Sequence, residues 1–391
     1  MNILVLTPYV PYPPNFGGAV RIYNLIRQLS RRHAVHLLTF REAGGAGDPA
    51  GLAPFCQTIT TIPRVVTDKR WQQVRSLFSA QSFQWRFHYH AAMQAAIVRV
   101  TREQAIDRIM VEFSQMACYQ FPAGVPVVLD EHNVEFDLLD RMAQQEEGGM
   151  LRRWYNRREA KKFRREELSA CRAAALTMVT SDRDGELLCR HAPGLRTARI
   201  TNGVDCDYFV RPDGPRRADS AVFVGATHYF PNEDGVMFFL QEMHARILAV
   251  CPGFRFTVVG GRPSSALKAL HSDSVRVLGY VDDVRPHMWE SSVFVVPLRM
   301  GGGTRFKVVE AMAAGMPVVS TRLGAEGIPA EDGRDLLLAD TPEAFAEAVV
   351  QVLTDPALAA RLAANGLAFV RRHFDWPVIG AELETALARL D

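Results

Sequence analysis

Short apolar runs alternate with helix-spaced apolar residues along this chain. Residues Ile3–Leu6 form a continuous apolar run, the pattern of a parallel strand buried on both faces. A loop rich in Pro and Gly follows and includes Gly17 and Gly18. Apolar residues then recur at helical spacing up to Leu29, before a second run at Val35–Phe40. This order of strand, glycine loop, helix and strand predicts the start of a βαβ unit.

The same alternation fills both halves of the chain. Residues 211–218 are rich in Pro, Gly, Arg and Asp, which is the composition of a linker. The pattern predicts an α/β protein of two Rossmann-like, doubly wound domains facing a central cleft. We place the domains at 1–210 and 211–373, with a C-terminal helix at 374–391 that crosses back to the first domain. Further helices are expected at 83–100, 133–146 and 150–172, and further strands at Ile106–Val111, Val125–Leu129, Leu176–Val179, Val222–Val224, Phe256–Val259, Val275–Leu278, Val293–Val296 and Val318–Ser320.

Composition and charge narrow the protein class. The chain has 391 residues, 48% of them hydrophobic and 23% charged, with a net charge of +2. This near-neutral balance gives no reason to expect a nucleic-acid partner. The six cysteines are scattered and form no CxxC pair, so we expect free thiols and no zinc site. The N-terminus reads as a strand rather than a signal peptide, and no run approaches the ~20 apolar residues of a spanning helix. We therefore expect a cytoplasmic protein.

A glycine-rich turn in the second half predicts a phosphate site. The segment Pro297–Glu310 runs from a strand into a helix expected to begin near Thr304, with Thr304 as its N-cap. Gly302 and Gly303 would allow close backbone approach to a ligand. A helix start offers free N–H groups and partial positive charge. The alternative is that these glycines form only a turn.

Charged residues on the same helix favour a nucleotide ligand. Arg305 and Lys307 place two cations beside the helix start, where they can pair with a diphosphate. Glu310 lies three residues beyond Lys307 on the same helical face and can accept both hydroxyls of a ribose. The set suits a nucleoside diphosphate, although arginine and lysine near a helix start are often merely solvated.

A polar cluster follows a buried strand in the first half. The sequence from Asp130 to Glu135 begins where the strand Val125–Leu129 ends, and open α/β sheets bind ligands at this edge. His132 is the main candidate, with the neighbouring carboxylates and Glu112 as further candidates. Capping of a helix that starts near Asn133 is the alternative, and for Asn133 itself the favoured one.

A basic stretch with interleaved aromatic residues spans residues 152–165. It carries eight arginines and lysines together with Trp154, Tyr155 and Phe163. Such a stretch can lie on an anionic membrane surface, which would place the protein peripherally at the inner face of the membrane. The alternative is a solvated helix face neutralised by local ion pairs with Glu159, Glu166 and Glu167.

Several motifs resemble one known family. The segment EAMAAGMPVVSTRLGAEG (Glu310–Gly327) is similar to the nucleotide-binding segment of family 4 retaining glycosyltransferases of the GT-B fold. The forms PYPP, EHNVE and GGGTRFK look most like the bacterial exopolysaccharide-associated sugar transferases of that family. The resemblance covers nearly the whole chain and is most specific over 275–330. Its other segments are Pro11–Phe40, Thr201–Phe209, Phe223–Gly235 and Leu278–Leu298.

The resemblance implies a function and a set of site residues. The chain would transfer a hexose from a nucleotide-diphosphate sugar to a glycan, lipid-linked or small-molecule acceptor, with retention of configuration and without a metal or cofactor. Residues 1–210 would be the acceptor domain and 211–373 the donor domain. Glu310 would bind the ribose, Arg305 and Lys307 the diphosphate, and His132 the donor sugar. The remaining donor contacts would come from Gly17, Gly18, Gly225, Gly261, Val281, Gly302, Gly303 and Thr304.

Two departures from the family pattern keep alternatives open. The family usually has a glutamate eight positions before Glu310, and this chain has Gly302 there. The Arg/Lys pair often found after the first strand of the second domain is replaced by residues such as Thr227 and Asn232. A nucleotide-sugar epimerase and a nucleotide-sugar-binding protein without transfer activity therefore remain alternatives. An NAD enzyme is weaker, because the first loop is not G-x-G-x-x-G.

Overall fold

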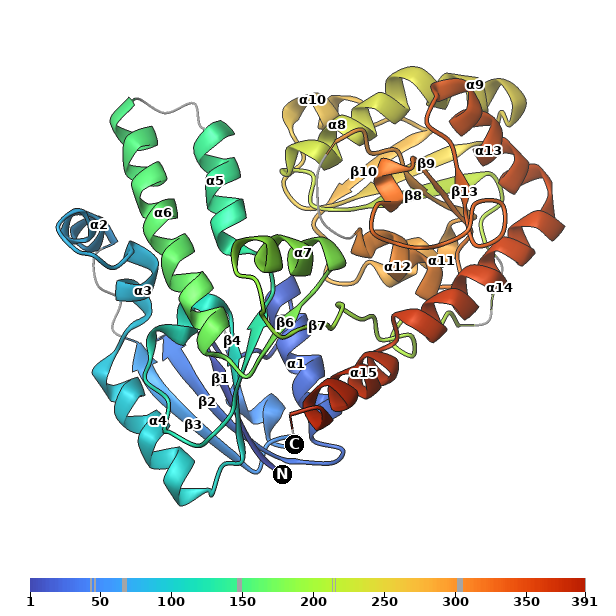
Figure 1. Cartoon of the computed structure of the whole chain (residues 1–391). Helices are drawn as coiled ribbons and strands as arrows, with labels where there is room; N and C mark the ends of the chain where they lie inside the picture. Colours follow the sequence, from blue (N-terminus) through green and yellow to red (C-terminus); the bar gives the residue numbers. More distant parts are fainter. Residues whose placement is uncertain are drawn as a thin grey trace. The chain divides into compact units, whose positions relative to one another are not determined.

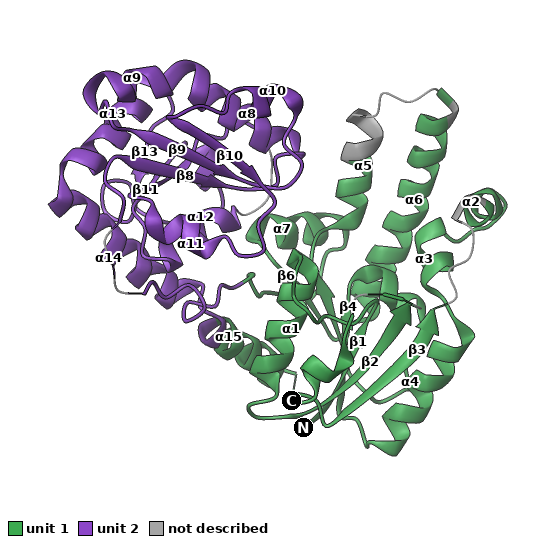
Figure 2. Ribbon diagram, turned by 180° about the vertical axis from the view of Figure 1, so that it is seen from behind, with its two compact units in different colours: residues 1–202, 379–391 green, residues 203–378 purple. Residues whose placement is uncertain are grey.

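The structure is a computed structural model that describes residues 1–42, 44–45, 47–64, 69–145, 150–212, 214, 216–300 and 305–390. The chain divides into two compact units (Figures 1 and 2). Unit 1 comprises Met1–Asn202 and Ile379–Asp391, and unit 2 comprises Gly203–Val378. Each unit is built on one parallel β-sheet with helices packed over it.

The unit 1 sheet has seven parallel strands in the order β3-β2-β1-β4-β5-β6-β7. The strand order reverses between β1 and β4, so the carboxyl ends of these two strands form the switch point at which such sheets bind ligands. The strands are β1 (Asn2–Thr7), β2 (Ala34–Glu42), β3 (Thr58–Arg64), β4 (Arg108–Glu112), β5 (Val127–Glu131), β6 (Leu176–Val179) and β7 (Thr197–Arg199).

Buried apolar runs explain the centre of this sheet. Residues 3–7 of β1 are all buried, because β1 pairs with β2 on one side and with β4 on the other. The edge strand β3 was not predicted. Its sequence TITTIPR mixes threonine with isoleucine, includes Pro63 and is mostly half-buried, so it lacks the apolar run that marks the central strands.

The unit 1 helices follow the expected alternation with some shifted boundaries. The helix expected at 83–100 is two helices, because the chain is extended at Tyr89 and His90. The helix expected near Asn133 begins at Glu135. The helices are α1 (Gly17–Leu29), α2 (Lys69–Leu77), α3 (Phe83–His88), α4 (Ala91–Glu103), α5 (Glu135–Gln145), α6 (Met150–Ala173) and α7 (Asp182–His191).

The last helix of the chain, α15 (Trp376–Ala388), packs on α1, as the sequence predicted for a helix returning to the first domain. The packing is close, because a Cβ atom added at Gly380 would lie 2.8 Å from Gln28 Cβ. His33 Nε2 lies 2.9 Å from Glu384 Oε2 and joins α15 to the turn between α1 and β2.

The unit 2 sheet has six parallel strands in the order β10-β9-β8-β11-β12-β13. Its order reverses between β8 and β11, which repeats the arrangement of unit 1. The strands are β8 (Ser220–Val224), β9 (Arg255–Val259), β10 (Val275–Gly279), β11 (Val293–Val296), β12 (Val318–Ser320) and β13 (Leu337–Leu338).

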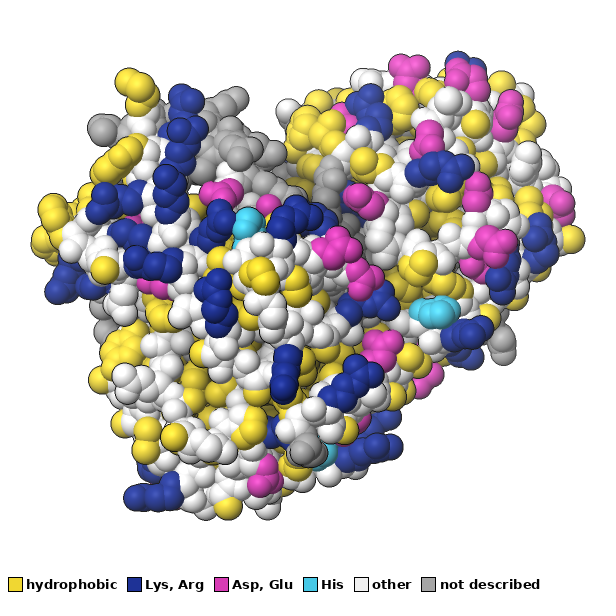
Figure 3. All heavy atoms as spheres, in the orientation of Figure 1, with side chains coloured by type: hydrophobic (Ala, Val, Ile, Leu, Met, Phe, Trp, Pro, Cys, Tyr) yellow, Lys and Arg dark blue, Asp and Glu magenta, His cyan; other side chains and the backbone are white. Residues whose placement is uncertain are grey.

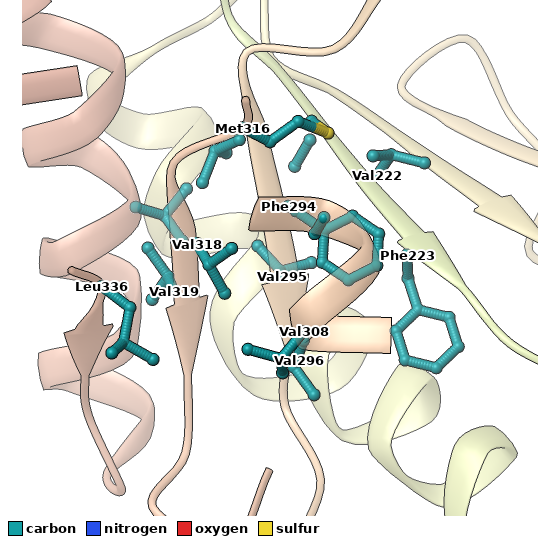
Figure 4. Packing of buried hydrophobic residues seen from close by; sticks show 14 of the residues in the cluster. Val222, Phe223, Phe294, Val295, Val296, Val308, Met316, Val318, Val319 and Leu336 are labelled. Carbon is teal, nitrogen blue, oxygen red and sulfur yellow. The ribbon is translucent and has the colours of Figure 1, made fainter. Parts of the chain in front are cut away.

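Helix α12 (Phe306–Ala313) is held against this sheet by its apolar face. Val308 of α12 lies beside Val296 of β11, and Phe223 of β8 packs nearby (Figure 4). Burial of Val308, Val309 and Met312 leaves Lys307 and Glu310 on the half-buried side. The other helices of unit 2 are α8 (Phe230–Phe238), α9 (His244–Val250), α10 (Ser265–Ala269), α11 (Arg285–Glu290), α13 (Pro342–Thr354) and α14 (Pro356–His373).

The cysteines and the helix lengths can be compared with the expectations from composition. All six cysteines are free thiols, as predicted. Within the described residues, none of the helices combines the length and the apolar character that a bilayer crossing requires.

Candidate functional site

The unit 2 switch point brings Lys307 to the loop that follows β8. Strands β8 and β11 pair directly, and α12 follows β11 in the chain. Lys307 Nζ donates a 2.6 Å hydrogen bond to Asn232 Oδ1 and lies 4.1 Å from the ring centre of Phe223. Asn232 Nδ2 in turn donates to Ala226 O at 2.9 Å. Lys307 thus supplies a cation to a loop that lacks the Arg/Lys pair of the family pattern.

Gly225 is required beside this lysine on steric grounds. A Cβ atom at position 225 would lie 2.6 Å from Lys307 Nζ and 3.1 Å from Asn232 Nδ2. The glycine also lies against its neighbouring strand, since its amide donates to Val259 O at 2.9 Å. Gly225 and Lys307 therefore lie in direct contact.

The loops after β8, β9 and β10 meet at the same edge of the sheet. Thr227 Oγ1 donates to Gly261 O at 2.9 Å, and the Gly260 amide donates to Gly279 O at 2.9 Å. Tyr280, which is 77% exposed, lies next to Gly261. The half-buried side chain of Val281 packs toward the core. The structure therefore gathers Gly225, Gly261 and Val281 near one edge.

Burial brings Lys307 and Glu310 close to neutrality. It lowers the pKa of Lys307 to about 7, with further lowering by the charge of Arg305. It raises the pKa of Glu310 to about 7, and Lys307 partly offsets this rise. Each group would gain from a ligand of complementary character, because an anion favours the ammonium form and hydroxyl donors favour the carboxylate.

The start of α12 differs from the prediction. The helix begins at Phe306, and Arg305 rather than Thr304 occupies the N-cap position, without a side-chain cap hydrogen bond. The N-cap is thus one residue later than expected, within the usual variation of assigned helix ends. Arg305 is only 7% exposed, so it is more buried than a solvated cation. The predicted site residues Gly302, Gly303 and Thr304 lie outside the described residues.

In unit 1, His132 belongs to a buried network at the ends of β4 and β5. His132 Nε2 lies 2.8 Å from Glu112 Oε2 and 3.5 Å from Asp130 Oδ2. Arg21 of α1 binds Asp130 through two parallel hydrogen bonds of 2.8 and 2.7 Å. Its remaining nitrogen, Nη1, donates to Ile200 O at 2.9 Å. The four side chains form one continuous polar chain through the interior.

The charges in this network are distributed unevenly. Burial raises the pKa of Glu112 well above its usual range, and the charge of Asp130 adds to the rise. Burial also lowers the pKa of His132 to about 3. The charge of Arg21 and its hydrogen bonds outweigh burial at Asp130 and lower the pKa of that carboxyl. Arg21 and Asp130 are therefore the ionised pair, and a neutral Glu112 can donate to Nε2 while His132 carries its own proton on Nδ1.

Aromatic rings cover the network on the side of α1. Phe113, at a φ of +69°, lies on His132 with ring centres 3.8 Å apart. A Cβ atom at Gly18 would overlap the Tyr9 hydroxyl and lie 3.1 Å from Phe113 Cζ, whereas position 17 meets nothing within 4 Å. Gly18, but not Gly17, is therefore needed for this packing.

Neighbouring residues of the EHNVE motif have a different role from His132. Glu131 is buried on the other side of the strand, where Cys171 Sγ lies 3.7 Å from Glu131 Oε1. The cap expected from Asn133 is instead supplied by Glu167 of α6. Glu167 accepts the amides of Glu135 and Phe136 at 2.8 and 2.9 Å. The capping carboxylate comes from a residue more than 30 positions away in the chain, so local sequence could not reveal it.

Three potential ligands of a metal ion occur together in unit 1. Within the described residues, Glu112, Asp130 and His132 offer ligand atoms that lie within 4.8 Å of one another. Both Asp130 oxygens already accept from the buried Arg21, whose charge would repel a cation. The arrangement therefore fits a hydrogen-bonded network better than a metal site.

Sequence reasoning missed Arg21, Tyr9 and Phe113. Arg21 lies among the apolar residues of α1 and is 1% exposed, so only its unusual place on a buried helix face could have drawn attention to it. Asn232 was noticed as part of an atypical loop, but its contact with Lys307 depends on the fold.

Comparisons with known proteins identify the family. A family model described as Glycosyltransferase Family 4 matches residues 17–208, and one described as Glycosyl transferases group 1 matches residues 218–355. The phosphatidyl-myo-inositol mannosyltransferase of Mycobacterium tuberculosis is 31% identical over 210 residues, which cover 49% of this chain and 54% of that protein. An uncharacterized protein in the cps region of Klebsiella pneumoniae is 23% identical over 40% of this chain and 42% of its own. The chain thus spans about half the length of the curated relatives that it matches.

Solved structures share the fold over the full length. HepE of Anabaena, determined in complex with UDP, has a TM-score of 0.64 and 18% identity and covers 100% of both chains. WaaG, a glycosyltransferase involved in lipopolysaccharide biosynthesis, has a TM-score of 0.61 and 16% identity over 99% of this chain and 98% of its own. Together with the two family models, which match most of the sequence, these likenesses show that the chain belongs to the family 4 glycosyltransferases and has their two-domain α/β GT-B fold.

Proposed function

We propose that this chain is a retaining glycosyltransferase that moves a hexose from a nucleotide-diphosphate sugar to an acceptor. The observation that carries the proposal is the pair Lys307 and Glu310 on α12, held at the switch point of the unit 2 sheet. In open α/β sheets this edge binds ligands, and a helix start there favours phosphate. The relatives support the donor class, since HepE was determined with UDP-glucose and other relatives are GDP-mannose-dependent enzymes.

The proposed donor contacts use two cations and one carboxylate. Lys307 would pair with the diphosphate, and Arg305 would add positive charge at the helix start. Glu310 would accept the ribose hydroxyls. Loops around Gly261 and Val281 would hold the base, and His132 is the unit 1 candidate for a contact to the donor sugar.

The chemistry would depend on stabilising the leaving group. As the glycosidic bond to the diphosphate breaks, negative charge grows on the phosphate oxygen that Lys307 and Arg305 would face. Pre-positioned charges stabilise this state without reorganisation. In a front-face mechanism, the leaving phosphate would take the acceptor proton, and the new bond would form on the same face with retention. These two cations would replace the metal, so we propose metal-independent transfer.

We further propose a lipid-linked acceptor. Glycan, lipid-linked and small-molecule acceptors fit the family equally. The mannosyltransferase relatives carry names of phosphatidylinositol acceptors, which favours a lipid-linked one. Such an acceptor would require the enzyme to work peripherally at a membrane, with residues 152–165 as the contact.

A donor screen followed by a transfer assay tests the proposal. Thermal unfolding is measured with UDP-, GDP- and TDP-sugars, and a ligand at ~100 times its dissociation constant should stabilise the fold by about 2.7 kcal/mol. The stabilising donor is then incubated with candidate acceptors, with and without EDTA. The proposal predicts release of nucleoside diphosphate with sugar transfer in both conditions. Epimerised donor without transfer, or binding without any turnover, would contradict it.

A further inference from the structure

The outer face of α6 carries a stripe of exposed apolar and basic residues. Met150, Trp154, Arg157 and Lys161 follow one another at intervals of four, three and four residues, so they share one side of the helix. Met150 is 85% exposed and Trp154 is 54% exposed. The stripe therefore begins with large apolar side chains and continues with cations.

A second exposed apolar surface on α2 adjoins this stripe. Trp71 of α2 is 66% exposed, and Phe78, directly after α2, is 90% exposed. Arg158 of α6 donates to Leu77 O at 3.3 Å, and Arg165 donates to Ala80 O at 2.6 Å. These bonds hold the segment that carries Phe78 beside α6. Figure 3 shows basic and hydrophobic side chains intermingled where α2 and α6 lie.

The glutamates of α6 are directed inward rather than along the exposed face of the helix. Glu159, Glu166 and Glu167 are all buried. Glu159 accepts the Phe83 amide, Glu166 accepts the Ser82 amide at 2.8 Å, and Glu167 caps α5. Glu159 also pairs with the half-buried Lys162 at 2.8 Å. The exposed face thus presents cations while the carboxylates serve the interior.

We propose that the surface formed by Trp71, Phe78, Met150 and Trp154 with Arg157 and Lys161 docks on an anionic lipid bilayer. Large apolar side chains that are this exposed are costly in water and gain by entering the headgroup boundary. Tryptophan suits that boundary, and the neighbouring cations attract acidic headgroups. A purely electrostatic partner such as a nucleic acid would not account for the apolar residues. The surface lies entirely in unit 1 and does not depend on the proposed transfer reaction.

Vesicle co-sedimentation of the full chain tests the proposal. Phosphatidylcholine vesicles are compared with vesicles that also contain phosphatidylglycerol. Binding is expected only to the anionic vesicles and should weaken in high salt. The double variant Arg157→Gln/Lys161→Gln should bind about 30-fold more weakly, which corresponds to ~1 kcal/mol for each cation. The double variant Phe78→Ser/Trp154→Ser should bind about tenfold more weakly or worse.

Helix α4 offers matched controls in the same unit. Its exposed residues Val98, Arg99 and Arg102 allow an Arg99→Gln/Arg102→Gln variant and a Val98→Ser variant. Both should bind vesicles like the parent, and thermal unfolding should show that every variant is folded. Absence of parent binding, or equal losses in the controls, would overturn the proposal. Binding to an acidic polymer without binding to vesicles would also overturn it. Nucleotide binding by the same variants keeps this result separate from the proposed function.

Discussion

The two sheets share a strand order, yet their switch points are built differently. In unit 1, Arg21 and Asp130 are an ionised pair, almost completely buried, and their hydrogen bonds satisfy each other. In unit 2, Lys307 and Glu310 are half-buried, and burial brings both pKa values to about 7. In unit 1 the two charges pair with each other, whereas in unit 2 the two groups have charges that a ligand would stabilise.

This difference indicates a structural role for the unit 1 network and a ligand-binding role for Lys307 and Glu310. A buried, paired network fixes the orientation of His132 and does not need to change charge. A half-buried lysine and glutamate can respond to a phosphate and to hydroxyl groups by changing their protonation. We therefore expect substitutions of the Arg21–Asp130 pair to affect mainly folding and substitutions of Lys307 to affect mainly turnover.

The largest expected effect is on unit 1 stability. Asp130→Asn would leave the buried Arg21 charge unpaired and should lower the free energy of unfolding by about 3–5 kcal/mol. Urea denaturation measures it. The control is Asp182→Asn. Asp182 Oδ2 lies 3.3 Å from Arg199 Nη1, and the Arg199 side chain is 50% exposed. Loss of this exposed pair should lower the free energy of unfolding by no more than ~1 kcal/mol. Similar losses in both variants would remove the contrast.

The next effect is on turnover through unit 2. Lys307→Ala and Arg305→Ala should each lower turnover at least about a hundredfold, since one charged transition-state contact is worth ~2.7–4 kcal/mol. Both should remain folded by thermal denaturation. Lys268→Ala, on the exposed side of α10, should keep parental turnover. Near-normal turnover in the first two variants would refute the assigned role of α12.

A smaller effect should follow from steric displacement of Lys307. An alanine at position 225 would push Nζ away from Asn232, and affinity for the nucleoside diphosphate should fall about tenfold, as for one lost charged hydrogen bond. At Gly253, which precedes β9, the added Cβ atom would meet only Asp219 Oδ2, at 3.5 Å, so Gly253→Ala should bind normally. Calorimetric titration distinguishes the two variants. Equal affinities would show that Lys307 is not positioned by this contact.

The smallest effect is a pH dependence of nucleotide affinity, which should have opposite signs in variants of Lys307 and of Glu310. Lys307 loses its charge as pH rises through about 7, which weakens diphosphate binding, whereas Glu310 gains its charge over the same range, which strengthens ribose binding. The parent should therefore show a shallow pH dependence of affinity. Glu310→Gln should bind more weakly at about pH 8 than at about pH 6, and Lys307→Met should show the reverse. Identical slopes in the two variants would contradict these pKa shifts.

The sequence predicted the central elements because buried parallel strands are apolar throughout. The predicted bounds of β11 and β12 match those of the structure. The edge strand β3 and the two-residue β13 escaped detection because neither has a long apolar run. Helix breaks such as the one at Tyr89 depend on packing and gave no local signal.

The candidate site was only partly accessible from sequence. Local spacing identified Lys307 and Glu310, since they lie on one helix face. The contacts of Lys307 with Gly225 and of Arg21 with Asp130 join residues that are far apart in the chain, so periodicity could not reveal them. The buried state of the network around His132 likewise follows from the fold.

The most direct test is a crystal structure of this chain with the nucleoside diphosphate that stabilises it best. We predict that the diphosphate lies at the start of α12 within hydrogen-bond distance of Lys307, and that Glu310 accepts the ribose hydroxyls. A nucleotide bound at another edge of unit 2, or a Glu310 carboxylate that makes no ribose contact, would contradict the account.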